Sequence, residues 1–219
     1  MSLPDLTTSR LRLRAWRESD FEPHVMWEAD VRVNEFLPFL HAPRTEVASH
    51  EQIARFLATP AEKRGEWVRA KAQKPYPEWA VEVTGIADVI GAIGFAMDTF
   101  ESDFTPCVEI GWRFAPAYWG NGYATEAARA VLSYGFTTLG LSEIFSMSAL
   151  GNKRSFALME RIGLRYVKDF EWPLLPEGHP LRPYALYKLT RAEWITRLPW
   201  MSDKGLGRSL IPGQGSSSR

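Results

Sequence analysis

Residues 115–127 of this sequence read APAYWGNGYATEA, where an apolar strand pattern ends, two glycines follow and a helical pattern begins. Gly120 and Gly122 can adopt the positive φ angles of such a turn, and without side chains they let a ligand reach the backbone. The first N–H groups of the helix and the positive end of its dipole then face one place. The stretch predicts a phosphate- or pyrophosphate-binding turn, although a tight turn that needs glycine for its geometry alone has the same pattern.

Other phosphate-binding motifs do not fit this turn. A P-loop carries Lys followed by Ser or Thr after its last glycine, and no such pair follows Gly122. The dinucleotide-binding fingerprint needs a third glycine in a strand–helix–strand setting, and that glycine is missing. The pattern therefore indicates a different class of phosphate site.

Hydrophobic periodicity around the turn predicts a mixture of helices and strands. Apolar patterns predict strands over residues 10–16, 78–84, 88–97, 108–114, 143–148, 164–170 and 184–189. Helical spacing covers most of 31–75, and predicts further helices over 124–139 and 153–162. This order favours an α+β fold with a mixed, mostly antiparallel sheet of six to seven strands flanked by helices. In the first strand we expect the arginines to occupy the solvent face.

Length and composition set limits on the function. A chain of 219 residues suits one domain over 1–200, and the Gly- and Ser-rich residues 201–219 are expected to form a disordered tail. The 26 basic and 26 acidic side chains balance, which argues against a nucleic-acid partner. The longest apolar run, over 89–97, is far shorter than the roughly 20 residues of a membrane span, and the N-terminus shows no signal-peptide pattern. We expect a cytoplasmic protein that does not bind membranes.

Cysteine and histidine are too few for a disulfide framework or a Cys/His metal site. The chain has one cysteine and four scattered histidines. Cys107 is expected to be a buried, inert thiol, because nothing near it in the sequence would lower its pKa. We therefore expect no metal.

Four motifs occur in the order and spacing of one known family. The turn over 119–127 resembles the acetyl-CoA pyrophosphate loop of the GNAT superfamily of N-acetyltransferases. Three further stretches resemble its first strand, its fourth strand and its second conserved helix: Thr8–Arg14, Val108–Trp112 and Asn152–Ser155. The similarity spans residues 7–194 and points to the branch of the ribosomal-protein N-terminal (RimJ/RimL-type) acetyltransferases. It implies a GNAT-like sheet that splays into a V-shaped slot for acetyl-CoA.

The resemblance implies transfer of an acetyl group from acetyl-CoA to a primary amine, by direct attack in a ternary complex and without a metal. The implied cofactor-binding residues are the strand end that bonds the pantetheine arm, the pyrophosphate turn and the start of the second helix: Trp112, Arg113, Phe114, Trp119, Gly120, Asn121, Gly122, Tyr123, Ala124, Thr125 and Asn152. Trp119 departs from the family, in which Arg or Gln is common at this position. The indole is expected to cover the turn or to pack beneath it.

Two side chains have implied catalytic roles. Glu109 is the candidate base that removes a proton from the amine, directly or through water, and Gly111 on the same strand face leaves room for a substrate. Ser155 is the candidate that orients and stabilises the departing CoA thiolate. Both have a structural alternative: Glu109 can be a solvent-facing sheet residue, and Ser155 a first-turn serine bonded to its own backbone. The structural alternative for Asn152, one of the implied cofactor-binding residues, is a helix N-cap.

The resemblance also implies that the acceptor binds opposite CoA, between the first helices and the Pro-rich loop over 171–183, which contains His179. Trp67 and Trp79 are candidate walls, and core packing would explain both equally well. The acceptor can be a protein N-terminus or a small-molecule amine, and the chain can be a monomer or a homodimer. The alternative function is a non-catalytic acyl-CoA-binding regulatory module, which needs the same turn but neither Glu109 nor Ser155.

Overall fold

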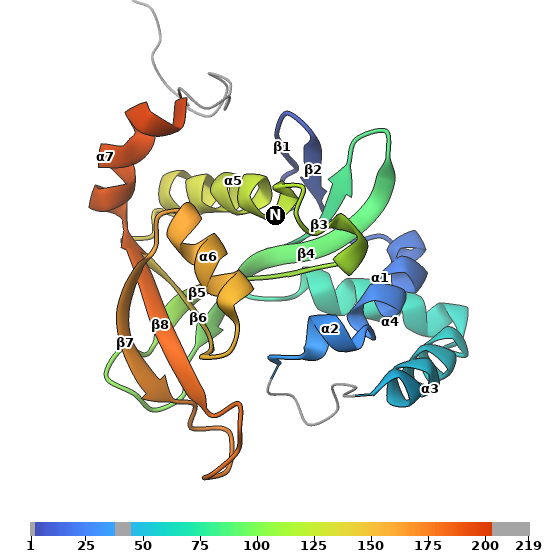
Figure 1. The fold of residues 1–219 in the computed structure, drawn as a ribbon. Coiled ribbons are helices and arrows are strands. Elements are labelled where there is room, and N and C mark those ends of the chain that lie inside the picture. Colours follow the sequence, from blue (N-terminus) through green and yellow to red (C-terminus); the bar gives the residue numbers. More distant parts are fainter. Residues whose placement is uncertain (1–2, 38–44, 203–219) are drawn as a thin grey trace, which may run out of the picture.

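The computed structural model describes residues 3–37 and 45–202, and one open sheet runs through them (Figure 1). The strands are β1 (Leu6–Thr7), β2 (Leu11–Arg14), β3 (Glu78–Val83), β4 (Ala87–Asp98), β5 (Cys107–Phe114), β6 (Glu143–Ala149), β7 (Arg165–Glu171) and β8 (Pro183–Thr190). Their order in the sheet is β1-β2-β3-β4-β5-β6-β8-β7, so β8 inserts between β6 and β7. The α+β plan is confirmed.

The sheet has one strand more than the sequence predicts. The additional strand is β1, in which Leu6 pairs with Leu13 and Thr7 with Arg12. Two residues are too short to show an alternating pattern, so the strand exists only because β2 offers a pairing edge.

Helices cover both faces of the sheet. They are α1 (Phe21–Glu28), α2 (Val31–Asn34), α3 (Glu46–Leu57), α4 (Ala61–Ala72), α5 (Tyr123–Thr137), α6 (Lys153–Arg161) and α7 (Arg191–Ser202). α5 and α6 lie together over the middle of the sheet, and α1 to α4 gather on its other side (Figure 1). The predicted end of the domain at residue 200 falls inside α7, and the expected tail beyond Ser202 lies outside the described residues.

Two apolar layers follow from strand alternation. Val81 and Ile93 belong to the large core cluster under α5 and α6, whereas Ala80 and Ala92 belong to a cluster with Trp16 on the α1 face. Successive side chains of a strand point to opposite faces, so one strand supplies both layers. Both sides of the central sheet are therefore fixed, which gives the strand ends a rigid frame.

Arg14 corrects the expectation that the arginines of β2 face solvent. Its side chain is 2% exposed, and its guanidinium binds Asp20 at 2.7 Å, Glu82 at 2.8 Å and the Asp88 carbonyl oxygen at 2.7 Å. The alternation of polar and apolar residues in β2 cannot show that Asp20, the N-cap of α1, and Glu82 of β3 enclose this side chain. A buried guanidinium is tolerated there because carboxylates and a carbonyl satisfy it.

β5 and β6 are the point where the sheet opens. They are parallel and share a single pair, Glu109 with Phe145, while all other neighbouring strands are antiparallel. Beyond it, the Ser146 hydroxyl donates to the Ile110 carbonyl oxygen at 2.9 Å, and the Met147 N–H donates to Glu109 Oε1 at 3.1 Å. Side chains thus satisfy backbone groups that a continuous ladder would pair. The expected splayed slot is confirmed.

Candidate active site

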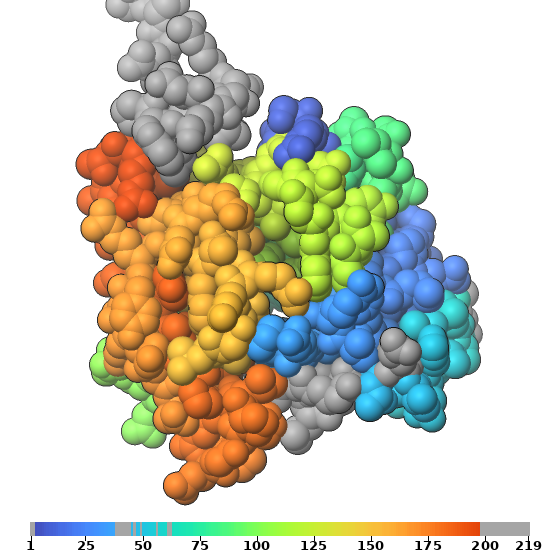
Figure 2. Space-filling model, in the orientation of Figure 1, coloured from blue at the N-terminus to red at the C-terminus, as the bar shows by residue number. Residues whose placement is uncertain are grey.

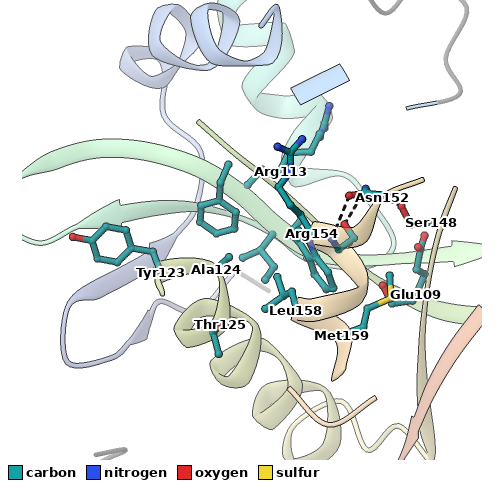
Figure 3. Close-up of a pocket in the computed structure, with 18 of the residues that line it drawn as sticks. Glu109, Arg113, Tyr123, Ala124, Thr125, Ser148, Asn152, Arg154, Leu158 and Met159 are labelled. Carbon is teal, nitrogen blue, oxygen red and sulfur yellow. Dashed lines mark hydrogen bonds between the residues drawn. The ribbon is translucent and has the colours of Figure 1, made fainter. Parts of the chain in front are cut away.

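A cavity of about 1140 Å³ occupies the opening between β5 and β6. In Figure 2 the blue α2, the yellow-green start of α5 and the orange α6 surround this hollow. Figure 3 shows Tyr123, Ala124 and Thr125 toward one end of the cavity and Ser148, Asn152 and Glu109 toward the other. The turn and the candidate catalytic groups therefore lie at opposite ends of one space.

The glycine turn has the geometry that its sequence predicts. Gly120 and Gly122 have φ angles of +80° and +79°, and Gly122 is the N-cap of α5. No side chain caps the helix, so the backbone N–H groups of the first turn are available to an anion. Gly120, Gly122, Tyr123, Ala124 and Thr125 all line the cavity.

Arg10, the residue directly before β2, contacts the turn, which the sequence did not reveal. Its Nη1 donates to the Asn121 carbonyl oxygen at 3.0 Å, and its Nη2 lies 2.7 Å from Glu126 Oε2. The guanidinium also lies 4.7 Å from the centre of the Tyr123 ring. Arg10 lines the cavity and adds a positive charge beside the predicted anion site.

Asn121 does not line the cavity, unlike the other predicted cofactor-binding residues. Its side-chain amide donates back to the carbonyl oxygens of Tyr118 at 3.3 Å and Trp119 at 3.2 Å. The side chain therefore shapes the turn instead of facing a ligand.

Trp119 is half-buried against the large core cluster and connects the turn to the end of β5. Its indole N–H donates to the Phe114 carbonyl oxygen at 2.8 Å. Arg154 of α6 lies 4.4 Å from the centre of the Trp119 ring, and its Nη2 lies 3.1 Å from Glu35 Oε2. The bulky residue that departs from the family pattern thus links three elements around the cavity.

Trp112, Arg113 and Phe114, at the end of β5, border the cavity. The Arg113 side chain extends to Glu28 of α1, on the face of the sheet where the acceptor is expected. It binds Glu28, whose Oε2 lies 2.5 Å from His24 Nε2. Burial would raise the pKa of Glu28, yet the His24 hydrogen bond and the Arg113 charge lower it to about 2. Burial lowers the pKa of His24, so the ring is neutral while Glu28 is ionised.

Glu109 projects into the cavity from β5, which contradicts the alternative of a solvent-facing residue. The residue is half-buried in the cavity wall, and burial of its carboxyl group together with the neighbouring Asp98 raises its pKa well above the usual range. The adjacent position on the same face is open, because a Cβ added at Gly111 would meet no atom within 4 Å. A raised pKa makes Glu109 a stronger base than an ordinary carboxylate once it is ionised.

Ser155 and Asn152 form one hydrogen-bonded unit at the start of α6. Asn152 is the N-cap, as its structural alternative predicted, and its Oδ1 accepts from the Ser155 N–H at 3.2 Å. Its Nδ2 donates to Ser155 Oγ at 3.1 Å and to Ser148 Oγ at 2.9 Å (Figure 3). Since Ser155 Oγ accepts a bond from Asn152, its own O–H can donate into the cavity, which both residues line.

Apolar and aromatic side chains form part of the cavity wall on the side where the acceptor is expected. They include Val33, Phe36, Met147, Trp172 and Tyr184. Trp172 comes from the expected loop, but His179 accepts a hydrogen bond from the Leu181 N–H at 3.1 Å and does not line the cavity.

The two other candidate walls do not line the cavity and pack in or against the core. Trp79 is fully buried and donates to the Pro4 carbonyl oxygen at 2.8 Å, and Trp67 packs against Trp16, Phe21 and His24. Sequence spacing could not separate a cavity wall from a core position here.

Cys107 is buried, and burial followed by the nearby carboxylates raises its pKa to about 12. Within residues 3–37 and 45–202, no cluster of three or more His, Cys, Asp or Glu side chains could hold a metal ion. In the same part of the chain, no helix has the length and apolar character needed to span a membrane.

The family model described as "Acetyltransferase (GNAT) domain" matches residues 10–165. The chain therefore belongs to the GNAT acetyltransferase family. Among curated proteins, it is 31% identical to the uncharacterized N-acetyltransferase YoaA of Bacillus subtilis over 162 residues, which cover 74% of this chain and 83% of YoaA. It is 36% identical to the uncharacterized protein YkkB of the same organism over 111 residues, 50% of this chain and 59% of YkkB.

The match to the putative ribosomal N-acetyltransferase YdaF of Bacillus subtilis is shorter: 40% identity over 88 residues, 39% of this chain and 46% of YdaF. The first curated relatives are matched over only 40% to 59% of their length.

Solved structures show the same fold. A GNAT-family acetyltransferase from Bacillus anthracis superposes with a TM-score of 0.65 at 24% identity, covering 86% of this chain and 99% of that one. Spermidine N-acetyltransferase from Vibrio cholerae, solved with CoA and spermine, has a TM-score of 0.62 at 16% identity and covers 85% of this chain and 99% of that one.

Proposed function

We propose that the chain is an acetyl-CoA-dependent N-acetyltransferase that acetylates a primary amine by direct attack in a ternary complex. One observation carries the proposal: the splayed slot has a glycine turn with free helix N–H groups at one end and Glu109 with Ser155 at the other. A pyrophosphate held at the turn and a pantetheine arm along β5 would bring a thioester toward these two residues.

The chemistry requires a neutral amine. A lysine side chain has a pKa near 10.4 and an α-amino group one near 7.7–8.0, so both arrive largely protonated at neutral pH. Glu109 takes this proton, and Gly111 beside it leaves space for the amine. The nitrogen then attacks the thioester carbon and the C–S bond breaks, while the Ser155 hydroxyl stabilises the thiolate as it leaves. The nitrogen gives its second proton to the departing sulfur, so the products are a neutral amide and the CoA thiol.

The acceptor remains a choice between a protein N-terminus and a small-molecule amine. The YdaF match supports the RimJ/RimL-type assignment and hence a peptide N-terminus, whereas the Vibrio cholerae structure holds a polyamine. The aromatic wall with Phe36, Trp172 and Tyr184 suits an amine next to an apolar group. A cytoplasmic location and a monomeric or homodimeric state stay predictions.

The test is CoA release, followed with a thiol reagent, against peptides with Ser, Ala or Asp N-termini, polyamines, aminoglycosides and free amino acids. Calorimetric titration of CoA runs beside it. Turnover with one class supports the enzyme and identifies its acceptor. Tight CoA binding without turnover of any acceptor would favour the non-catalytic acyl-CoA-binding module.

A further inference from the structure

A second carboxyl group lies beside Glu109. Asp98 is the last residue of β4, and its cross-strand partner is Cys107, while Ala96 is the partner of Glu109. Residues two apart on a strand share a face, so Asp98, Cys107 and Glu109 all lie on the acceptor face of the sheet. Asp98 and Glu109 are diagonal neighbours across β4 and β5, within reach of each other's side chains.

The β4–β5 register brings the two carboxyl groups within reach of each other, and each is among the causes that shift the other's pKa. Asp98 Oδ2 is buried, and no N–H or hydroxyl group of the described residues donates to it. Two carboxylates cannot bond to one another unless one holds a proton, because ionised carboxylates only accept. A hydrogen bond between Asp98 and Glu109 therefore forms when the ionised pair takes up one proton.

The surroundings leave this pair without a cation. Glu143 on β6 faces the same region, but Lys188 on β8 lies 3.2 Å from its Oε2. Cys107 is a neutral thiol, and Met147 contributes only its backbone N–H to Glu109. No Lys or Arg forms an ion pair with Asp98 or Glu109 in the described part of the chain. The charge of each carboxylate therefore acts mainly on the other.

We propose that Asp98 is a positioning residue that orients Glu109 and strengthens it as the base for the incoming amine. The inference rests on the proposed function. An N–H bond of the ammonium breaks and an O–H bond forms on Glu109. The new O–H donates to the Asp98 carboxylate, which stabilises the protonated form of Glu109. The proton leaves to solvent before the next turnover, so atoms and charge balance without another reactant.

Burial and the second negative charge act in the same direction on Glu109. Burial first and the Asp98 charge second raise its pKa, and burial raises that of Asp98. Such a pair titrates in two steps that belong to both groups, and the upper step sets the acid side of the pH–rate profile.

The first test measures the ionisation of Asp98 and Glu109 and does not depend on enzyme activity. Because Cys107 is the single cysteine of the chain, 13C-labelled cysteine gives one Cβ signal whose shift reports charge on its neighbours. We expect this signal in the wild-type protein to follow the upper ionisation of the pair. In D98N the midpoint falls by about one pH unit or more, because the like charge is gone and an amide donates to Glu109. An unchanged midpoint would overturn the proposal.

Two further variants make this titration specific. E109Q should remove the upper step altogether. E143Q should leave its midpoint in place, because Glu143 is near the thiol but paired with Lys188. A midpoint that moves as far in E143Q as in D98N would show a general field effect and would refute a specific pair.

The second test is kinetic and uses the amine that the wild-type enzyme turns over. D98N is expected to move the acid limb of kcat/KM against pH to lower pH and to reduce the plateau kcat about tenfold. In the E109Q background, D98N should change kcat/KM less than about twofold, because Asp98 acts through Glu109. If D98N lowered kcat/KM equally in the wild-type and E109Q backgrounds, Asp98 would have only a structural role. The same would follow if D98N lowered kcat/KM without moving the acid limb of its pH profile. If no amine is turned over, the proposed function fails, and the cysteine titration still decides on the pair.

Discussion

The indole N–H of Trp119 donates a 2.8 Å hydrogen bond to the carbonyl oxygen of Phe114. Phe114 ends β5 and Trp119 opens the glycine turn, so one bond fixes the angle between the predicted pantetheine-binding strand and the predicted pyrophosphate site. The position of the turn therefore depends on a side chain, and not on the glycines alone.

Replacing Trp119 with Phe should weaken CoA binding moderately. The variant keeps a ring for Arg154 but loses the donor to Phe114, at a cost of about 1 kcal/mol, or about fivefold in Kd. Calorimetric titration of CoA measures the change. W172F, at the acceptor end of the cavity, is the matched control and should bind CoA normally. Equal affinities of W119F and the wild type would show that the bond does not position the turn.

Gly122→Val should abolish CoA binding while the protein still folds. A β-branched residue at a φ of +79° is strained, and its side chain would enter the anion site next to Arg10 Nη2. Gly85→Val is the control, because Gly85 has a φ of +73° in the β3–β4 turn and does not line the cavity. Both variants should lower Tm alike, and only G122V should lose CoA. Normal CoA affinity in G122V would refute the pyrophosphate site.

Ser155→Ala should lower kcat by about 10- to 100-fold with little change in the Kd of CoA, because the lost hydroxyl acts on the thiolate as it leaves. Steady-state thiol release and calorimetry separate the two quantities. Ser148→Ala removes the other acceptor of Asn152 Nδ2 and serves as the comparison. If both variants lose the same activity, the effect belongs to the Asn152 network and not to a proton of Ser155.

Arg14→Ala should destabilise the protein by about 3–5 kcal/mol, because Asp20 would remain buried and charged without its partner. The control on the same strand is Arg12→Ala. Arg12 is 44% exposed and pairs with the exposed Asp5, so its loss should cost less than about 1 kcal/mol. Urea unfolding at neutral pH gives both free energies. Similar values for the two variants would contradict the role assigned to the buried arginine.

Glu28 gives the protein an acid-sensitive contribution to stability. Its pKa in the folded state is about 2, below its value of about 4.3 when unfolded, so the stabilisation is present above the unfolded value. It is lost as the pH falls from there toward 2, and by pH 3 roughly 2 kcal/mol should be gone. Unfolding of the wild type and E28Q from pH 7 to pH 3 should therefore converge. A constant difference between them would show that Glu28 is not paired as described.

The sequence predicts the parts of the site that are local in the chain. Two glycines before a helical pattern indicate the turn, and Glu109 and Ser155 lie in short motifs at family spacing. Strand periodicity predicts seven of the eight strands. These features depend on neighbouring residues, which a single sequence displays.

The remaining features depend on contacts between distant segments. Asp98 becomes relevant only through the β4–β5 register, and the His24–Glu28–Arg113 chain only when α1 packs on the sheet. Contacts with Asp20 and Glu82 bury Arg14, although the polar–apolar alternation of β2 predicts that its side chain faces solvent. Neither register nor helix docking can be obtained from hydrophobic period alone.

The most direct measurement is the initial rate of CoA release from acetyl-CoA with the amine panel, for the wild type and E109Q side by side. We expect amine-dependent turnover by the wild type with at least one acceptor class. In E109Q we expect a loss of about 100-fold or more at neutral pH, with CoA affinity unchanged. CoA binding without acetylation of any amine, or equal rates for both proteins, would contradict a GNAT enzyme that uses Glu109 as its base.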